Sequence, residues 1–456
     1  MEDRLFLPNL TWGSYTHMTD NARSLTEVTL SLDRGAPSGG MDSTRRALRP
    51  LTVSDPLYGA IKVSAWAAAL LATPPFQRLA GVSLSDVPGD LLFGHAFPSR
   101  LDHTIGVYHL ARVARPRDRA LQVAALAHDL GHGPFSHLSE TLMSEWLGED
   151  HETRSIRLLD AVRAALPESA QRRLDWLDWD EVASLMRGEG RGALLSGRLD
   201  YDNADNVARF LLHAGFGTPG YDPRVLARGL RYEASGDEQA QKTSASVSLQ
   251  LAAEHEGIAW QSDRARVYRF LHEGDYGHRN LAAHAMLRKA VDLAAATHIL
   301  PPDFFDLTDA GALALLGSAL DRGLLALVRR VQSDATQWHR CIWEAEAPAD
   351  ERALPALLAH AEGRLATEAQ LAAEAGLAPH EVICDALVSN ALRALPPLAT
   401  ANRSGPLIAQ PEPPTPPRVL HLFMAAGYGN DYARRLQRAA ERRFAPLGVC
   451  PRATPI

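Results

Sequence analysis

Residues 127–140 read AHDLGHGPFSHLSE and place three histidines and two acidic residues within fourteen positions. Residues 121–127, just before and into this stretch, read LQVAALA, an apolar run of helix-forming residues. We expect a helix that enters the core and presents His128 and Asp129 at its inner end. His132 would share a face with His128 if the helix persisted, but the glycines and the proline at 131–134 predict that it soon ends.

Asp129 is an unusual residue for the buried end of a helix. Aspartate is a poor helix former, and burying a carboxylate is costly unless a charged partner receives it. A divalent cation is one such partner, and imidazole nitrogen with carboxylate oxygen suits Mn, Fe, Ni or Zn better than Ca. The alternative is a structural network in which His128 and Asp129 pair with each other or with a nearby arginine. This stretch alone leaves both interpretations open.

Two other segments carry the same residue types. Residues 99–106 read SRLDHTIG and place His103 close to the start of a predicted helix. Residues 197–209 read GRLDYDNADNVAR and hold three closely spaced aspartates. The chain therefore offers a histidine, then a His-Asp pair, then an aspartate, in three separate segments.

This order resembles the HD superfamily of metal-dependent phosphohydrolases. Two further pieces, DPLYG at residues 55–59 and PFQRL at residues 75–79, occur in the order seen in the deoxynucleoside triphosphate triphosphohydrolases, including the sterile-alpha-motif-and-HD type. The resemblance covers about residues 51–290, and its most specific part is HDLGHGPFSH. It implies an all-α fold built on an HD-domain helical core.

The resemblance implies that one divalent metal ion is held by four side chains, His103, His128, Asp129 and Asp202. Asp202 is selected by register, because DYDNADNVAR at 200–209 aligns without a gap with the family segment Asp-x-Asp-Lys-x-Asp-Tyr-x-Ala-Arg, whose second aspartate binds the metal. A shifted register would select Asp200 or Asp205. Mn, Fe, Mg, Ni and Zn all fit such ligands. A divalent ion polarises a phosphoryl oxygen and lowers the pKa of bound water from about 15.7 towards about 7.

His137 and Glu140 stand three positions apart, so their side chains can touch on a helix. A carboxylate behind an imidazole fixes its tautomer and raises its basicity, which equips the imidazole to move a proton to a leaving oxygen. The alternative, which can hold at the same time, is a helix cap that begins at Ser136. By resemblance, His132 contacts phosphate or acts in acid–base catalysis and His151 contacts phosphate. The predicted catalytic residues are therefore His132, His137 and Glu140.

Arg100 is expected to clamp phosphate, because its planar guanidinium matches phosphate oxygens bidentately. The alternative is an exposed loop arginine. Residues 267–284 read VYRFLHEGDYGHRNLAAH, and the resemblance places Tyr268, His272 and a following His-Arg pair along the substrate pocket. Without the resemblance, this segment would be an amphipathic helix with solvated polar residues.

The positions around the sugar depart from the triphosphohydrolase pattern. Leu84 and Ser85 stand where the family has a glutamine that bonds a sugar hydroxyl, followed by leucine. Asn206 replaces a tyrosine that excludes a 2′-hydroxyl and is kept as a candidate substrate-binding residue. Phe210 replaces an aspartate for the 3′-hydroxyl, and Asn203 replaces a phosphate-binding lysine. Removing groups that hydrogen-bond a hydroxyl relaxes or redirects selectivity.

These residues predict a metal-dependent phosphohydrolase that hydrolyses a phosphate bond of a nucleotide. By resemblance it acts like a dNTP triphosphohydrolase, which releases a nucleoside and triphosphate, but with altered sugar selectivity. One alternative is an HD phosphatase or phosphodiesterase for another nucleotide, a modified nucleotide or a related phosphorylated small molecule. Others are a nucleotide-sensing HD module without catalysis, and an interaction scaffold in which the HD core only holds shape. Turnover of nucleotides distinguishes these hypotheses.

The composition is that of an ordinary soluble globular protein, with 46% hydrophobic and 22% charged residues. The net charge of −7 argues against general binding to nucleic acid or anionic membranes. The three cysteines are scattered and are expected to be reduced structural thiols. The N-terminal residues lack the apolar core of a signal peptide, and the most apolar run nearby is too short to span a bilayer. We expect a cytoplasmic protein with no membrane partner, and the resemblance implies a homo-oligomer.

At 456 residues the chain is too long for one compact core. Strand signals are weak, and residues 244–251 (SASVSLQL) are the candidate for an edge hairpin. The predicted fold is all-α, with additional C-terminal helices and at most a small β-hairpin. We expect five segments: a partly mobile N-terminal extension over 1–50, an HD phosphohydrolase domain over 51–300, a helical C-terminal region over 301–409, a proline-rich linker over 410–418 and a C-terminal helical segment over 419–456.

Overall fold

The structure is a computed structural model that describes residues 49–197, 199–233, 246–333, 339–347, 358, 360–388 and 418–451. The described part is predominantly helical, which confirms the predicted fold class. The N-terminal extension and the proline-rich linker fall almost entirely outside the described residues. Within the described residues, no helix combines the length and the apolar character needed to cross a membrane.

The described chain opens with a β-hairpin of β1 (Leu51–Asp55) and β2 (Gly59–Val63). The carboxylate of Asp55 shapes its turn, because its Oδ1 accepts the backbone N–H groups of Leu57 and Tyr58 at 2.8 and 2.9 Å. The following helices belong to the segment that the sequence predicts to be the HD domain, and they are called the HD region: α3 (Ala65–Leu71), α4 (Pro74–Arg78), α5 (Gly89–Phe93), α6 (Arg100–Ala114), α7 (Arg119–Ala127), α8 (Glu140–Leu147), α9 (His151–Ala165), α10 (Glu168–Arg173), α11 (Trp179–Met186), α12 (Tyr201–His213) and α13 (Pro223–Gly229).

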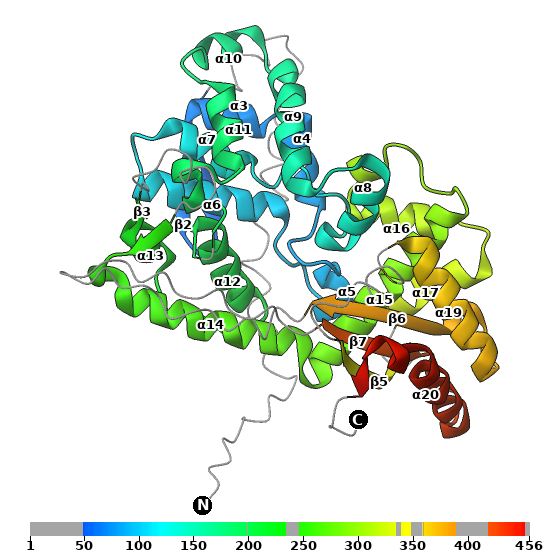
Figure 1. Cartoon of the computed structure of the whole chain (residues 1–456). Helices are drawn as coiled ribbons and strands as arrows, with labels where there is room; N and C mark the ends of the chain where they lie inside the picture. The colour runs from blue at the N-terminus through cyan, green and yellow to red at the C-terminus, as the bar shows by residue number, and fades with distance from the viewer. Residues whose placement is uncertain are drawn as a thin grey trace, which may run out of the picture.

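Helix α7 lies at the centre of this region. Residues 120–127 are all buried, as expected for a helix that is apolar on every side. It packs against α6, α9 and α11, and its leucines and alanines belong to one core cluster together with residues of the opening hairpin. Figure 1 shows α6 and α7 inside the group of blue, cyan and green elements. The predicted helix that enters the core ahead of the His-Asp pair is therefore present.

A small hairpin and two long helices follow. β3 (Leu230–Glu233) pairs antiparallel with β4 (Ser246–Leu249), which confirms a strand in the segment expected to form an edge hairpin. Helix α14 (Glu254–His272) runs along one border of the HD region, and α15 (Gly274–Ala296) continues into the C-terminal part (Figure 1). There α15 shares a second core with α16 (Asp309–Gly317) and α17 (Arg322–Gln332).

The C-terminal part contains a sheet that the sequence did not predict. Its antiparallel strands stand in the order β6-β7-β5-β8, and they are β5 (Arg340–Ala347), β6 (Val382–Val388), β7 (Arg418–Met424) and β8 (Cys450–Pro451). Helices α19 (Ala361–Ala375) and α20 (Asn430–Phe444) pack on one face, and α15 contacts β5 and β6. We expected at most a small β-hairpin, with only helices beyond residue 301, and this prediction underestimates the strand content of the C-terminal part.

Candidate metal centre and active site

Helix α6 positions the first histidine. Ser99 caps this helix and forms a capping box with Asp102, which fixes where the helix begins. His103 follows in the first turn, and its imidazole is fully buried. Because residues three apart share a helix face, Arg100 points the same way as His103.

The His-Asp pair stands where α7 ends. His128 is the C-cap residue of α7, and its Nδ1 lies 2.9 Å from the backbone oxygen of Ala125. Ser155 on α9 fixes the chain just beyond, since its hydroxyl donates to the backbone oxygen of His128 at 2.6 Å and accepts the N–H of Gly131 at 2.7 Å. A side chain at Gly131 would collide with α9, because a Cβ there would lie 2.0 Å from the backbone oxygen of His151.

Helix α12 supplies the third segment and separates the roles of its aspartates. Asp200 caps the helix, accepting the backbone N–H groups of Asn203 and Gly197 at 2.7 and 2.6 Å. Asp202 faces His103, and Asp205 lies behind that imidazole, with Oδ2 2.8 Å from its Nδ1. The geometry therefore favours the register that selects Asp202 over Asp200 or Asp205.

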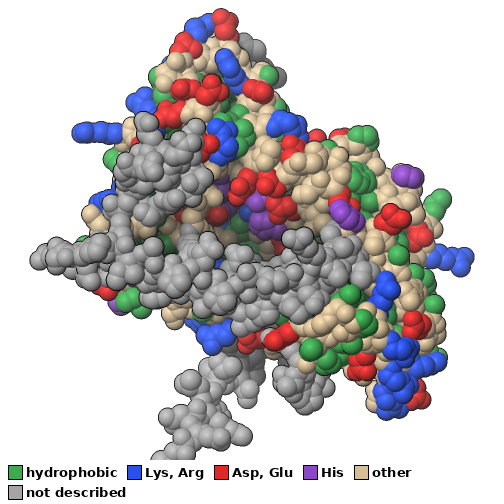
Figure 2. Space-filling model, in the orientation of Figure 1, with side chains coloured by type: hydrophobic (Ala, Val, Ile, Leu, Met, Phe, Trp, Pro, Cys, Tyr) green, Lys and Arg blue, Asp and Glu red, His purple; other side chains and the backbone are tan. Residues whose placement is uncertain are grey.

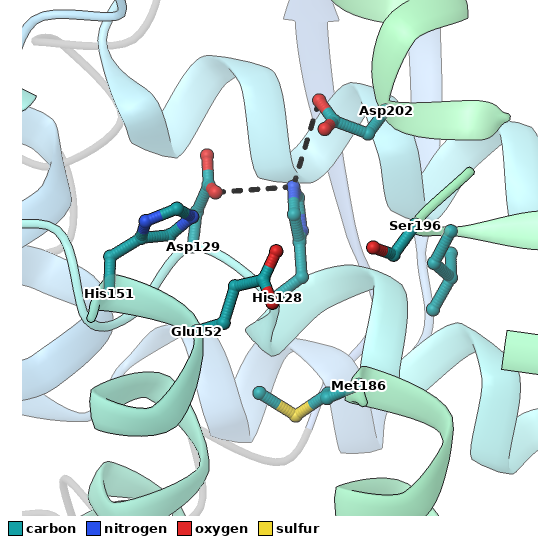
Figure 3. A pocket seen from close by; sticks show the side chains of 8 residues that line it. His128, Asp129, His151, Glu152, Met186, Ser196 and Asp202 are labelled. Carbon is teal, nitrogen blue, oxygen red and sulfur yellow. Dashed lines mark ion pairs between the residues drawn. The ribbon is translucent and has the colours of Figure 1, made fainter. Parts of the chain in front are cut away.

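The four predicted ligands converge from these three segments. The Nε2 atom of His103 lies 2.9 Å from Oδ1 of Asp202 and 3.7 Å from Oδ2 of Asp129. The Nε2 atom of His128 lies 3.4 Å from Oδ1 of Asp129 and 4.0 Å from Oδ1 of Asp202. Figure 3 shows the two carboxylates on opposite sides of His128. Both Nε2 atoms are buried and make no hydrogen bond of acceptable geometry. Candidate ligand atoms of His103, His128 and Asp129 lie within 4.8 Å of one another, so this donor set, with Asp202 beside it, fits a divalent cation.

The surrounding charges keep the carboxylates ionised. Burial opposes the charge on Asp129, but Arg100, with Nη1 2.7 Å away, and the neighbouring histidines hold the pKa of Asp129 well below its usual range. Burial also disfavours a charged His103, yet the carboxylates of Asp202 and Asp205 raise the pKa of His103 to about 9. The site therefore concentrates negative charge around two imidazoles, which is the field that a cation would neutralise.

A buried network of ion pairs holds Asp205 in position. Arg209 donates through Nε and Nη2 to Asp205 at 2.8 and 2.9 Å, and through Nη1 to Asp55 at 2.9 Å. All three side chains are fully buried. Gly106 leaves room for this network, because a Cβ there would lie 2.0 Å from Oδ1 of Asp205. The opening hairpin is thus connected to the centre through Asp55.

Three further histidines and a glutamate form an array beside this centre. His132 is buried, and its Nε2 lies 3.3 Å from Oδ1 of Asp129. The rings of His132 and His151 stack at 4.0 Å, and His137 meets both rings edge-on. Glu140 accepts from Nδ1 of His137 at 3.0 Å and from Nδ1 of His151 at 2.5 Å. Burial and the charge of Arg100 hold the pKa of His132 well below its usual range, so this imidazole is neutral.

The structure does not support the alternative roles considered for Arg100, an exposed loop arginine, and for Ser136, a helix cap. Arg100 is 5% exposed, so it is not a loop arginine on the surface. Its Nε donates to the hydroxyl of Ser136 at 3.0 Å, and that hydroxyl donates to the backbone oxygen of Ser83 at 2.5 Å. Ser136 therefore does not cap α8, whose N-cap residue is Ser139. Arg100 positions Asp129, and a clamp on phosphate stays a prediction.

A cavity opens onto the centre. Figure 3 shows the side chains around it, and Figure 2 shows acidic and histidine side chains gathered at a hollow near the centre of one face. Some lining residues were not predicted from the sequence, because an acid, a serine or apolar residues in helices and turns carry no motif. The lining comprises His128, Asp129, His151, Glu152, Met186, Leu195, Ser196 and Asp202.

Three predicted substrate residues lie elsewhere. Asn206, on α12, does not line the cavity, and neither do Tyr268 and His272 in the last turns of α14. His272 bonds back to its own helix, with Nδ1 2.8 Å from the backbone oxygen of Tyr268. Their roles in binding substrate stay predictions.

Comparison with known proteins identifies the central segment. The HD domain family matches residues 100–211, which span His103, the His-Asp pair and Asp202. Over 156 residues the chain is 30% identical to the deoxynucleoside triphosphate triphosphohydrolase SAMHD1 homolog of Dictyostelium discoideum, covering 30% of this chain and 30% of that protein. It is 32% identical over 100 residues to SAMHD1 of Homo sapiens, covering 19% of this chain and 16% of that protein.

A bacterial relative matches in the same way. The chain is 31% identical over 135 residues to the deoxyguanosinetriphosphate triphosphohydrolase-like protein of Rhizobium meliloti, covering 26% of this chain and 32% of that protein. The matches to these three proteins thus span about a third of their length or less. Residues 100–211 thus match the HD domain family, and the chain is similar over part of its length to deoxynucleoside triphosphate triphosphohydrolases.

Proposed function

We propose that this protein is a metal-dependent phosphohydrolase that cleaves a phosphate bond of a nucleotide, in the manner of a dNTP triphosphohydrolase. One observation carries the proposal. His103, His128, Asp129 and Asp202 come from three segments and meet around two buried imidazole nitrogens that make no well-aligned hydrogen bond, although carboxylate oxygens lie near them. Buried polar atoms without a well-aligned partner are rare in folded proteins, and a cation between the imidazoles and the carboxylates would satisfy both nitrogens.

The metal would be held by these four side chains and would polarise a phosphoryl oxygen and lower the pKa of bound water. The protein's own groups orient those ligands. Asp205 fixes the tautomer of His103 by accepting from Nδ1, so that Nε2 faces inward. Arg100 fixes one oxygen of Asp129 and leaves the other directed towards His128 and His132.

Proton transfer would belong to the histidine array. Glu140 accepts from Nδ1 of both His137 and His151, which leaves their Nε2 atoms for substrate. His137 is half-exposed and His151 lines the cavity, so both can meet a phosphate that lies beside Asp129. A leaving oxygen would receive its proton from one of these imidazoles, and Glu140 would stabilise the imidazolium before the transfer.

We expect this protein to recognise the sugar of its substrate with different residues from those of the family pattern. Phe210 stands where the resemblance predicts an aspartate for the 3′-hydroxyl, and its ring packs edge-on against Phe97 at 5.3 Å and Phe93 at 6.4 Å. An apolar aromatic group cannot accept a hydrogen bond from a hydroxyl. We therefore propose weaker selection for the sugar hydroxyls, and a nucleoside plus triphosphate as products.

The proposal is tested by turnover with identified products. Purified protein loaded with Mn or Mg is offered deoxynucleoside triphosphates, ribonucleoside triphosphates, monophosphates and cyclic nucleotides, and products are resolved by anion exchange. Triphosphate release supports the proposal, and pyrophosphate or orthophosphate redirects it to another bond. Asp129→Ala and His128→Ala should abolish activity, whereas Asp222→Asn, which alters a surface cap of α13, should not. A folded, metal-loaded protein that binds nucleotides without turnover would contradict it.

A further inference from the structure

The face of the C-terminal sheet that meets α15 carries a row of polar side chains. Glu344 on β5 pairs in register with His421 on β7, and His421 pairs with Asp385 on β6. Directly opposed residues of an antiparallel sheet project to the same face. The opposite face is apolar, and its residues form the core beneath α19 and α20. Three strands therefore bring polar side chains together on one side of an otherwise apolar sheet.

A β-bulge adds a cysteine to this row. The register of β5 against β7 shifts between Cys341 and Trp343, so that Cys341 opposes Phe423 while Glu344 opposes His421. Residues three apart in a regular strand point to opposite faces, and the extra residue of a bulge reverses that relation. Cys341 consequently lies on the same face as Glu344 and packs with Phe423 in the core that α15 shares.

The three side chains offer one sulfur, one oxygen and one nitrogen to a common point. The candidate ligand atoms of Cys341, Glu344 and His421 all lie within 4.8 Å of one another. Nδ1 of His421 is 3.3 Å from Oε1 of Glu344, and Sγ of Cys341 is 4.0 Å from the same oxygen. Cys341 and His421 are 8% and 6% exposed, and Glu344 is half-buried, so two of the three candidate ligands are shielded from solvent.

His421 supplies an independent indication that a ligand belongs here. Its Nδ1 is buried and makes no hydrogen bond of acceptable geometry, although Oε1 of Glu344 is close. A buried polar atom without a proper partner costs about 1–3 kcal/mol, so such atoms call for an explanation. A simple ion pair between His421 and Glu344 would align that nitrogen with the carboxylate and would not involve the thiol.

We propose that Cys341, Glu344 and His421 form a second metal site, of the zinc class, that ties β5 to β7. Thiolate, imidazole and carboxylate together are typical zinc ligands, and three protein ligands leave a fourth position open. The site shares no residue with the HD centre, since its three side chains belong to strands of the C-terminal sheet. It goes beyond the proposed function and does not depend on it.

The site is connected to the histidine array by a series of side-chain contacts. Asp385, the register neighbour of His421, faces His284 at 3.3 Å, and Nε2 of His284 lies 3.8 Å from Oδ2 of Asp86. Oδ1 of Asp86 accepts the backbone N–H of His137 at 3.1 Å. A metal that holds β5 to β7 would therefore also restrain His421 and its neighbour Asp385, from which this series of contacts begins.

Cobalt spectroscopy tests the assignment. Metal-free full-length protein is titrated with Co²⁺, and a thiolate-to-cobalt charge-transfer band is expected in the near ultraviolet. The band should disappear in Cys341→Ser and persist in two control variants. In Cys384→Ser the change lies on the opposite face of the sheet, and in Cys450→Ser it lies on an exposed cysteine of β8. Absence of the band in the wild-type protein, or its persistence in Cys341→Ser, would overturn the proposal.

Zinc content gives a second readout that does not require enzyme activity. The variant Asp129→Asn impairs the HD centre but should still bind one equivalent of zinc. The double variant Asp129→Asn/Cys341→Ser should not bind this equivalent. Because Cys341→Ser alters a buried residue, Glu344→Gln provides a variant at a half-buried position, and it should weaken zinc binding at least tenfold. Zinc should raise the melting temperature of the wild-type protein but not of Glu344→Gln. Equal zinc binding by the wild-type protein and Glu344→Gln would contradict the proposed zinc site, whether or not the protein hydrolyses nucleotides.

Discussion

Asp205 holds His103 from behind: its Oδ2 lies 2.8 Å from Nδ1 of the imidazole, so Nε2 is directed at Asp202 and Asp129. A carboxylate behind a histidine ligand fixes the tautomer and increases basicity. Asp205 is itself held by Arg209, which is also paired with Asp55. The predicted ligand is thus oriented by a buried network that reaches back to the first hairpin.

Replacing Asp205 should weaken metal binding without removing a ligand. Asp205→Asn is expected to lower the affinity for Mn about 10- to 100-fold, because a neutral amide is a weaker acceptor for Nδ1–H and no longer raises the basicity of His103. Isothermal titration of the metal-free protein measures this, with Asp160→Asn, an exposed change on α9, as control. Unchanged affinity would show that Asp205 serves only the ion pair with Arg209.

A methyl group at Gly106 should destabilise the fold. Its Cβ would lie 2.0 Å from Oδ1 of Asp205 and 2.5 Å from Nη2 of Arg209, so the buried pair must shift. We expect Gly106→Ala to lower the free energy of unfolding by about 1–3 kcal/mol. Gly317→Ala, at the end of α16 with no atom within 4 Å, should be neutral or stabilising. Urea unfolding compares the two, and equal effects would contradict the packing argument.

Glu140 should matter for turnover but not for metal content. Glu140→Gln removes the charge that both His137 and His151 face, so kcat is expected to fall about 10²- to 10⁴-fold while bound metal is unchanged. Glu149→Gln, which weakens the pair with the exposed Arg157 and leaves the histidine array untouched, serves as the matched control. A wild-type kcat in Glu140→Gln would remove the array from the proposed chemistry.

His213 should make the protein less stable in acid. Burial, together with Arg209 and His95, lowers the pKa of His213 to about 4, whereas an unfolded histidine has a pKa of about 6.5. The unfolded chain therefore takes up the proton first, and stability that is complete above about pH 6.5 is lost as the pH falls towards 4, by up to about 3 kcal/mol. Relative to wild type, His213→Gln should gain stability as the pH falls.

The measurement is the free energy of unfolding in urea at several pH values for wild type and His213→Gln. His255→Gln, an exposed change on α14, is the control and should follow the wild-type dependence. If the difference between wild type and His213→Gln stays constant with pH, the histidine is not held neutral in the fold.

Ser155 should stabilise the turn that carries the His-Asp pair. Ser155→Ala leaves the backbone oxygen of His128 and the N–H of Gly131 without their partner, at a cost of about 1–3 kcal/mol. Metal affinity should fall together with stability, because His128 is no longer fixed against α9. Thermal unfolding and metal titration check both effects, and Ser318→Ala, at an exposed helix end, should change stability by less than about 0.5 kcal/mol.

The sequence by itself predicted the HD segment and its candidate ligands, and the HD domain family matches that segment at residues 100–211. The apolar run before His128 predicted the buried helix α7, since an all-apolar helix must be interior. The spacing of His137 and Glu140 predicted their pairing, because residues three apart meet on a helix. These inferences are local, so they need only the periodicity of one element and the ordered residue types of three segments.

Only the tertiary structure decided which groups meet across long stretches of chain. The partnership of Asp205 with His103 spans about a hundred positions, and no local pattern predicts that Asp205 stands behind this imidazole. The C-terminal sheet escaped prediction because β5, β6 and β7 are stabilised by partners far apart in sequence rather than by their own alternation. Cys341, Glu344 and His421 come together only because a bulge sets their register, and register is a property of paired strands, not of one strand alone.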